Sequence, residues 1–359
     1  MNTLINIISS TKGGGAELLV RELHNIYTNH DVDSYAIYLS GSPDDLKKNE
    51  AVLGVKPSNP MNIFRIRKIF KELLRKAKNR GVIVHAHLTW PFLYVALATL
   101  GLPKIKLIYT EHSTTNKRRN IPMLWFLERF FYRRYARVIC ISEGVRNALA
   151  KWVGPKIAER LETIPNGSRI YSLIKRSSLD ERLPRLVSVG SLSSRKNFAT
   201  TIRAIGQMRN EIDSYTIVGD GPGRTTLEQI IQQEQLEEKV RLVGWSDSIE
   251  KYLHVADIQL IPSLWEGFGL VAVEGMSTGL PVVASNVNGL SQVLGESNPA
   301  VTLINNVESV DYWVGGIRKT VDKLNSLGAN SLAQSSRHQA EKFTLDAMAY
   351  RYLELYRTL

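Results

Sequence analysis

Two carboxylates, Glu266 and Glu274, lie on either side of a glycine-rich turn in the stretch Ser263–Gly275. An apolar, strand-like run precedes this turn and a helical pattern follows it. The free N–H groups expected near Gly269 and Leu270 therefore form a site for an anion. A carboxylate can accept hydrogen bonds from two neighbouring hydroxyls, which suits a sugar ring at Glu266 and a ribose at Glu274. The local alternative is that Glu266 is a cap and Glu274 an ordinary helix carboxylate.

Two other turns carry cations or glycines. Lys196, with Arg195 beside it, follows an expected strand at 185–189, where a cation would offset the charge that develops on a leaving diphosphate. Gly14 and Gly15 follow the first expected strand, and a glycine-rich turn at the start of a helix lets backbone donors meet a phosphate or sugar oxygen. A solvated basic turn and a tight strand-to-helix turn remain as alternatives.

Histidines and one acidic triplet raise the question of other chemistry. His112 ends an expected strand next to Glu111, and a strand end at a ligand site favours a functional role. His85 and His87 alternate along one strand with no carboxylate or third histidine nearby in the sequence, so we interpret both as structural. The triplet Asp31–Asp33 imitates a metal-binding pattern, but it lies in a polar turn far from the other candidates. We therefore predict a solvated loop there and no metal site, because a cationic side chain and a helix dipole can replace a divalent ion.

The elements that must position these residues follow a regular order. Short apolar runs alternate with helical patterns along the 359 residues, which predicts parallel sheets covered by helices on both faces. A turn at Pro165–Gly167 and a polar stretch after it divide the chain. We expect two Rossmann-like, doubly wound α/β domains, 1–168 and 169–342, facing each other across a cleft. Residues 343–359 are expected to form a helix that packs back toward the first domain.

The spacing from Glu266 to Glu274 resembles the Glu-x7-Glu signature of the family-4 retaining glycosyltransferases, which have the GT-B fold. The resemblance covers most of the chain and includes, in order, Gly13–Glu17, Glu111-His112, Ile141-Ser142, Pro165–Gly167, Val189-Gly190 through Lys196-Asn197, Val218–Pro222, Val243–Trp245 and Gly279–Ser285. Any one of these elements is weak, but their order, spacing and strand-to-helix context together make a strong match.

The resemblance implies Glu266, His112 and Lys196 as catalytic residues. It implies that the nucleotide-sugar donor is bound by Gly14, Gly15, Arg195, Lys196, Gly244, Trp245, Glu266, Gly267, Phe268, Gly269, Leu270 and Glu274. The backbone at Gly244 and Trp245 would hold the nucleobase, the alternative being a turn with a packed tryptophan. The family usually has an arginine directly after the glycine that matches Gly190, where this chain has Ser191. Either Arg195 replaces that arginine, or Lys196 and the backbone hold the diphosphate alone.

The implied reaction is transfer of a sugar from a nucleotide sugar, most simply a UDP-sugar, to a glycan or lipid-linked saccharide in surface polysaccharide biosynthesis. The resemblance implies retention of configuration. No pair of carboxylates suited to double displacement is evident, so we expect same-face attack. We expect no metal or other cofactor. A nucleotide-sugar epimerase of the same fold and a basic nucleic-acid-binding module remain as alternatives. An NAD-dependent oxidoreductase is unlike this chain, because Leu18 stands where the third glycine of its fingerprint would be.

The positive charge of the chain is concentrated in its first half. The formal net charge is +12, and residues 1–170 contain 27 Lys and Arg against 13 Asp and Glu. Residues 62–80 and 117–137 are basic stretches with apolar and aromatic residues interspersed, a pattern that suits an anionic membrane surface. The alternative is that each is a surface helix that buries its apolar face in its own domain. No nucleic-acid motif accompanies the charge, so we expect a pyrophosphate-bearing acceptor or a membrane as the partner.

The remaining features concern the location of the protein. Cys140 is the single cysteine and lies in an apolar run, which excludes an intrachain disulfide and fits a reducing compartment. Residues 81–103 carry no Lys, Arg, Asp or Glu, but histidines and a proline interrupt them, which favours a buried strand and helix over a membrane span. We expect a cytoplasmic protein, with peripheral attachment to the inner face of the cytoplasmic membrane as a further hypothesis.

Overall fold

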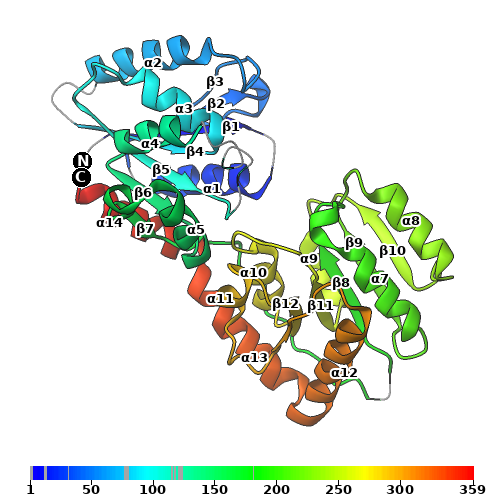
Figure 1. The fold of residues 1–359 in the computed structure, drawn as a ribbon. Coiled ribbons are helices and arrows are strands. Elements are labelled where there is room, and N and C mark those ends of the chain that lie inside the picture. The colour runs from blue at the N-terminus through cyan, green and yellow to red at the C-terminus, as the bar shows by residue number, and fades with distance from the viewer. Residues whose placement is uncertain are drawn as a thin grey trace. The chain divides into compact units, whose positions relative to one another are not determined.

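The computed structural model describes residues 3–11, 14–30, 32–76, 81–114, 116, 119, 124–180 and 182–359. Its internal contacts divide the chain into two units, one made of Met1–Gly167 with Leu345–Leu359 and the other of Ser168–Thr344 (Figure 1). The sequence placed these boundaries after residues 168 and 342. Each unit is built on one parallel β-sheet, so the expected fold class of two parallel-sheet α/β domains is confirmed.

The first unit has a seven-stranded sheet in the order β3-β2-β1-β4-β5-β6-β7. Its strands are β1 (Thr3–Ser10), β2 (Ser34–Ser40), β3 (Glu50–Val52), β4 (Val82–His87), β5 (Ile105–Glu111), β6 (Arg137–Cys140) and β7 (Leu161–Thr163). Its helices are α1 (Gly15–Asn29), η1 (Pro43–Asp45), α2 (Asn62–Lys76), α3 (Thr89–Ala98), α4 (Leu124–Arg134), α5 (Glu143–Val153), α6 (Pro155–Ala158) and α14 (Leu345–Arg357). All six residues of the central strand β4 are buried, as its nearly continuous apolar sequence predicts.

The second unit has a six-stranded sheet in the order β10-β9-β8-β11-β12-β13. Its strands are β8 (Arg185–Val189), β9 (Ser214–Val218), β10 (Val240–Gly244), β11 (Ile258–Ile261), β12 (Val282–Ser285) and β13 (Val301–Ile304). Its helices are η3 (Ser194–Lys196), α7 (Phe198–Gln207), α8 (Arg224–Gln233), α9 (Ile249–Val255), α10 (Leu270–Ser277), α11 (Leu290–Leu294), α12 (Val310–Leu327), α13 (Ala329–Ala340) and η4 (Glu341–Phe343).

In both sheets the strand order reverses between two central strands. β1 pairs in parallel with β2 and β4, and β8 pairs in parallel with β9 and β11. The chain thus winds from a central strand to one edge and then crosses to the other side. Open α/β sheets bind ligands outside the carboxyl ends of the strands at such a reversal. In the second sheet, the loops that follow β8 and β11 start there at Gly190 and Pro262.

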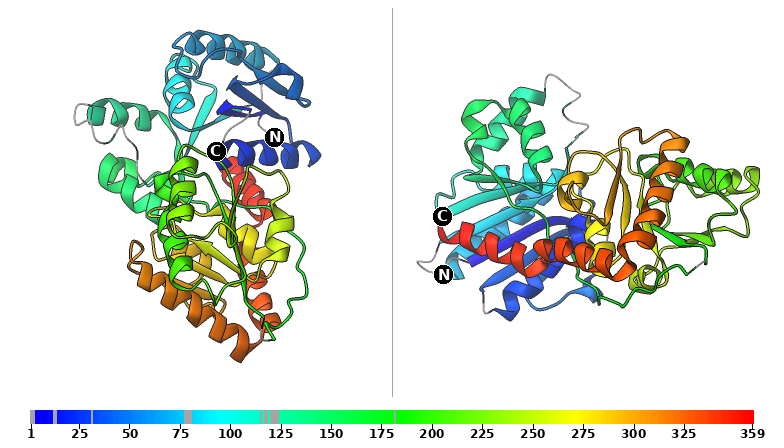
Figure 2. Two further views of the ribbon diagram at one scale, coloured as in Figure 1. Left: turned by 90° about the vertical axis from the view of Figure 1, so that its right-hand side faces the viewer. Right: turned by 90° about the horizontal axis from the view of Figure 1, so that it is seen from below.

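The last helix, α14, belongs to the core of the first unit. Its residues Met348, Tyr352 and Tyr356 are buried in one apolar cluster with Leu19 and Tyr27 of α1. Both views in Figure 2 show α14 running beside α1. A segment far from the first unit in sequence therefore completes its packing.

Candidate active site

An ion cluster joins the two loops that follow β8 and β11. The Nζ atom of Lys196 lies 2.5 Å from Oε1 of Glu266, and Nη1 of Arg195 lies 3.5 Å from Oε2 of the same carboxylate. Ser263 Oγ donates a hydrogen bond of 2.8 Å to Oε1. Because two cations surround one carboxylate, positive charge is left over for an anionic ligand.

The members of this cluster differ in their access to solvent. The side chains of Lys196 and Glu266 are only 9% and 8% exposed, whereas that of Arg195 is 37% exposed. The buried pair has lost most of its hydration, so each charge depends on the other for compensation. The guanidinium of Arg195 keeps donors on its open side, and its planar fork matches the oxygens of a phosphate.

Two glycines let Lys196 lie close to the backbone at the end of β8. A Cβ atom on Gly190 would lie 3.1 Å from Cε of Lys196, and one on Gly219 would lie 1.9 Å from the carbonyl oxygen of Gly190. Both glycines have positive φ angles, of 156° and 143°. The backbone N–H of Leu264 donates 2.8 Å to the carbonyl oxygen of Arg195 and ties the two loops together. Close backbone packing therefore positions the lysine.

The turn before α10 directs a helix N-terminus at the same edge of the sheet. Gly269 caps the helix with a φ of +92°, and Leu270 is its first residue. Amides at a helix start have no partner within the helix and attract negative charge. Gly267 and Phe268 precede the cap, and the Phe268 side chain is buried against the ring of Phe343, with centroids 5.4 Å apart. A ligand at this turn can therefore meet Phe268 only through its backbone.

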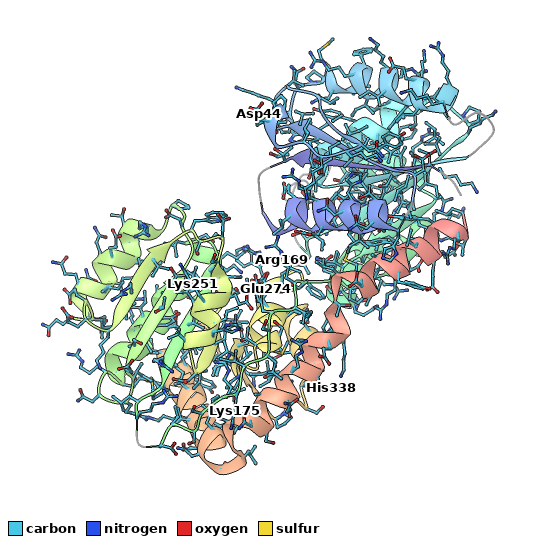
Figure 3. All side chains as sticks on the ribbon, turned by 180° about the vertical axis from the view of Figure 1, so that it is seen from behind. Asp44, Arg169, Lys175, Lys251, Glu274 and His338 are labelled. Carbon is cyan, nitrogen blue, oxygen red and sulfur yellow. The ribbon has the colours of Figure 1, made fainter. Side chains whose placement is uncertain are left out.

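Glu274 lies one turn into α10, near Arg169 (Figure 3). Burial raises the pKa of this carboxyl to about 7, and the positive charge of Arg169 counteracts part of the rise. Tyr171 bonds to Arg169, and burial raises the pKa of its hydroxyl to about 12. Glu274 thus changes charge near neutral pH. Once it is ionised, it can accept hydrogen bonds from a ligand.

Gly244 and Trp245 lie at the carboxyl end of β10, the edge strand. Gly244 has a φ of +80°, and its carbonyl oxygen accepts a hydrogen bond of 2.8 Å from the N–H of Gly219. The Trp245 side chain is 73% exposed, so the alternative of a packed tryptophan is wrong. An exposed indole here provides a flat apolar surface beside the sheet edge.

In the first unit, Gly14 caps α1 and Gly15 is its first residue. The carboxylate of Glu17 accepts hydrogen bonds from its own N–H and from that of Gly14, while burial raises its pKa. This arrangement matches the return contact of a capping box, in which the third helical residue bonds back to the cap. A phosphate or sugar oxygen at Gly14 would therefore compete with a carboxylate of the chain.

His112 follows β5 and meets a second histidine. Its Nε2 atom lies 3.3 Å from Nδ1 of His87, the last residue of β4. Burial lowers the pKa of His112 to about 4 and that of His87 well below its usual range, so both rings are neutral at neutral pH. Because β4 and β5 are neighbours, the third histidine that is absent near His85 and His87 in sequence is present in space.

Other titratable residues of the first unit have structural partners. Both ring nitrogens of His85 are engaged, at 2.7 Å from Tyr356 Oη and 2.7 Å from Thr110 Oγ1, so the structural interpretation of His85 is confirmed. Glu111 accepts from Arg119 at 2.8 Å and from Tyr132 at 3.1 Å. These contacts hold β4 and β5 to the elements around them.

The described residues contain no group of three His, Cys, Asp or Glu side chains placed to hold a metal ion. Asp33 accepts a hydrogen bond from Thr3, and Asp31 lies outside the described residues. In the part of the chain that the structure describes, no helix is long and apolar enough to cross a membrane. The uncharged run 81–103 forms β4 and α3, which confirms the buried strand and helix expected there.

Four residues of these sites were not singled out from the sequence: Ser263, Arg169, Glu17 and His87 as a partner of His112. The spacings Ser263-x-x-Glu266 and Gly14-x-x-Glu17 are local signals from which two of them could have been found. Arg169 and the pairing of His87 with His112 depend on contacts between distant segments and have no local signal.

The two doubly wound sheets, with a cationic site at the carboxyl edge of the second, define the GT-B class of transferases. Residues 13–169 match the family described as Glycosyltransferase Family 4, and residues 172–329 match the family described as Glycosyl transferases group 1. The chain belongs to the family-4 glycosyltransferases and is an enzyme of that class.

Individual relatives agree with this assignment. The chain is 29% identical over 282 residues to the UDP-Gal:alpha-D-GlcNAc-diphosphoundecaprenol alpha-1,3-galactosyltransferase of Escherichia coli, covering 72% of this chain and 71% of that protein. It is 27% identical over 225 residues to the N-acetyl-alpha-D-glucosaminyl L-malate synthase of Bacillus anthracis, covering 59% of this chain and 58% of that protein. These matches favour a glycosyltransferase over the epimerase and nucleic-acid-binding alternatives.

Solved structures share the fold over the whole chain. A glycosyltransferase from Rickettsia africae ESF-5 superposes with a TM-score of 0.83 at 19% identity, covering 99% of this chain and 98% of the other. HepE from Anabaena, crystallised in complex with UDP, superposes with a TM-score of 0.81 at 19% identity, and the match covers both chains completely. The GT-B fold expected from the sequence is therefore confirmed.

Proposed function

We propose that this glycosyltransferase transfers a hexose from a UDP-sugar, with retention and without a metal ion, to a saccharide on a polyprenyl diphosphate. The observation that carries the proposal is the cluster of Arg195, Lys196 and Glu266 at the carboxyl edge of β8 and β11. The name of the Escherichia coli relative supports the acceptor, and the complex of HepE with UDP supports the nucleotide. Assembly of a surface polysaccharide is the corresponding biological process.

In the proposed mechanism the cations of the cluster stabilise the leaving diphosphate. The bond from the anomeric carbon to the diphosphate oxygen breaks as a bond to the acceptor oxygen forms on the same face. The acceptor proton passes to the departing phosphate oxygen. Lys196 and Arg195 offset the negative charge that develops, and the amides at the start of α10 add to this effect. Glu266 orients hydroxyls of the donor sugar.

The second cation of the site is proposed to be Arg195. Ser191, which stands where the family usually has arginine, is exposed and lies 3.4 Å from Ser193, oxygen to oxygen. Arg195 comes from the short helix η3 and reaches the carboxylate of Glu266 beside Lys196. A guanidinium at this position can bind a diphosphate without the arginine that is missing after Gly190.

The rest of the donor is proposed to lie along the same edge of the sheet. Ionised Glu274 accepts hydrogen bonds from the ribose hydroxyls, and its environment allows ionisation near neutral pH. Gly244 and the exposed ring of Trp245 flank the uracil. Gly14 and Gly15 of the first unit are proposed to contact the donor's phosphates and sugar, and His112 to lie near the sugar and the acceptor.

The helices α2, α3 and α4 are proposed to form a layer that binds a membrane surface. α3 contacts both α2 and α4, so the described helices of the two basic stretches lie in one layer. Phe64 of α2 is 65% exposed, and Phe126 and Phe130 of α4 are 74% and 50% exposed. Exposed cations accompany them, namely Arg65, Lys68, Lys71, Arg75, Lys76 and Arg133. Apolar side chains beside cations suit an anionic bilayer, and this supports a cytoplasmic, peripheral location.

The proposal is tested with purified protein, a panel of UDP- and GDP-sugars and a synthetic polyprenyl-diphosphate saccharide. Mass spectrometry identifies the product, and NMR reports its anomeric configuration. We expect transfer from a UDP-sugar with retention and an unchanged rate in EDTA. An inverted product, or a rate that requires a divalent ion, contradicts the mechanism. Isomerised donor without transfer to the acceptor supports the epimerase alternative.

A further inference from the structure

The side chain of His87 is held in one orientation beside His112. It is 1% exposed, and its ring packs against that of His85 at a tilt of 33°, with centroids 4.1 Å apart. His85 is itself held by hydrogen bonds to Tyr356 and Thr110. With one face against His85 and its Nδ1 atom 3.3 Å from Nε2 of His112, His87 has a fixed polar partner.

The unpartnered nitrogen of His87 indicates which of its atoms carries the proton. Its Nε2 atom is buried and has no hydrogen-bond partner among the described residues. A buried N–H without a partner is rarer in proteins than a buried acceptor without one. The tautomer of His87 with the lower free energy therefore has no proton on Nε2 and carries its proton on Nδ1, which faces His112.

We propose that His87 is a positioning residue that donates from Nδ1 to Nε2 of His112 and so holds His112 with its own proton on Nδ1. This inference rests on the proposed role of His112 near the sugar and the acceptor. His112 is partly exposed, and among the described residues its ring makes one hydrogen bond, through Nε2 to His87, which leaves Nδ1 without a partner there. That N–H is therefore available to an oxygen atom of a ligand.

The chemical consequence is that His112 is a hydrogen-bond donor and not a base. Its basic lone pair, on Nε2, is occupied by the N–H of His87. Burial lowers the pKa of His112 to about 4, in agreement with a neutral ring at neutral pH. His112 can then donate to a sugar hydroxyl or to a developing negative charge, while the acceptor proton passes to the departing phosphate.

The first test reads the tautomer of His112 directly. Long-range 1H–15N correlation spectra of the full-length protein separate the two tautomers, and His112→Asn identifies the signal among the seven histidines. We expect His112 to carry its proton on Nδ1 in the unsubstituted protein. In His87→Leu we expect it to become a mixture of tautomers. A His112 that carries its proton on Nε2 in the unsubstituted protein overturns the proposal, whatever the activity.

The second test reads the effect on catalysis. His87→Leu should lower kcat by about tenfold with less change in the donor KM, because a misdirected donor weakens transition-state contacts more than ground-state binding. His87→Asn, whose amide can donate from nearly the same place, should restore most of kcat. His24→Leu is the matched control, since His24 is also buried but bonds to Ser34 and the Lys48 carbonyl.

The outcomes separate this inference from the proposed function. An unchanged kcat in folded His87→Leu overturns the inference, as does an Asn variant no better than the Leu variant. Equal losses in His87→Leu and His24→Leu indicate general damage and also overturn it. Full activity of His112→Asn contradicts the proposed role of His112, but the tautomer measurement still decides whether His87 directs its proton.

Discussion

Lys196 and Glu266 are 70 residues apart in the chain, and their side chains form a buried ion pair at the carboxyl ends of β8 and β11. The pair exists because β8 and β11 are neighbours in the sheet, although β9 and β10 lie between them in the sequence. Removal of Glu266 leaves Lys196 buried without its carboxylate, and removal of Lys196 leaves Glu266 paired only with the more exposed Arg195. Effects on catalysis and on stability must therefore be measured separately.

Substitution of either member of this pair tests the core of the site. We expect Lys196→Ala and Glu266→Ala each to reduce kcat on the order of a hundredfold, because a preorganised charge at the leaving group or sugar is lost. Each change should also lower the free energy of unfolding by about 3 kcal/mol, measured by urea denaturation. Arg203→Ala removes an exposed cation of α7 and is the control. Near-normal turnover in both variants would show that this cluster is not the active site.

Whether Arg195 replaces the arginine that the family usually has at the position of Ser191 is tested by restoring an arginine at that position. Arg195→Ala should weaken UDP binding by about tenfold, measured by calorimetry, since one charge-assisted contact to the diphosphate is lost. Ser191→Arg in the Arg195→Ala background should recover part of this affinity. Unchanged UDP binding in Arg195→Ala would show that Lys196 and the backbone hold the diphosphate alone.

The raised pKa of Glu274 predicts that nucleotide binding depends on pH. Its folded-state pKa is raised from 4.5 to about 7, so at pH 6 most of the carboxyl is protonated, and a ribose that needs the ionised form must displace that proton. UDP affinity should therefore rise with pH from 5 to 7 and level off above 7. Calorimetry in buffers of different ionisation enthalpy should detect proton release near pH 6. In Glu274→Gln both effects should disappear.

The same pKa shift has a consequence for stability. The folded state holds this proton more tightly than the unfolded chain does. Ionisation of Glu274 therefore does not lower the free energy of unfolding below pH 4.5, but lowers it progressively as the pH rises from 4.5 to 7. The penalty above pH 7 is on the order of 3 kcal/mol. Glu274→Gln should thus gain stability relative to the unsubstituted protein at pH 8 but not at pH 4.5, as read from urea unfolding at the two pH values. A gain of equal size at both would contradict the shift.

Membrane binding is predicted to depend on the exposed aromatic residues of α4. Phe126→Ser with Phe130→Ser should reduce co-flotation with anionic vesicles at low salt by tenfold or more, since inserting each ring contributes roughly 1.5–3 kcal/mol. Tyr312→Ser on α12 is the control, because this residue is also exposed but lies in the second unit. Absence of binding by the unsubstituted protein under these conditions would contradict the proposal.

Local patterns in the sequence were sufficient to predict the two parallel sheets and the turns that carry the candidate site. The mainly apolar runs at 82–86 and 258–261 form strands, because a strand buried on both faces must be apolar at most of its positions. Gly269 and Leu270 begin a helix as expected, because the turn at that point needs a positive φ, which glycine adopts readily. These features depend on neighbouring residues only.

Contacts between distant residues could not be predicted in the same way. The pairing of Lys196 with Glu266 depends on strand order, and that of His87 with His112 on the register between β4 and β5, in which His87 lies opposite Thr110. Arg169 reaches the surroundings of Glu274 from a segment without regular secondary structure. No periodicity within a short window encodes such contacts, since they arise only after the sheet is assembled.

The position of α14 determines the order in which the protein can mature during synthesis. Tyr352 and Tyr356 complete the apolar cluster over α1, and Tyr356 occupies a nitrogen of His85 in the centre of the first sheet. The ribosome makes these tyrosines only after all of residues 168–344. The apolar cluster of the first unit therefore stays incomplete until α14 is made, whereas the second unit can already fold. His85 of β4 acquires its hydrogen bond to Tyr356 last.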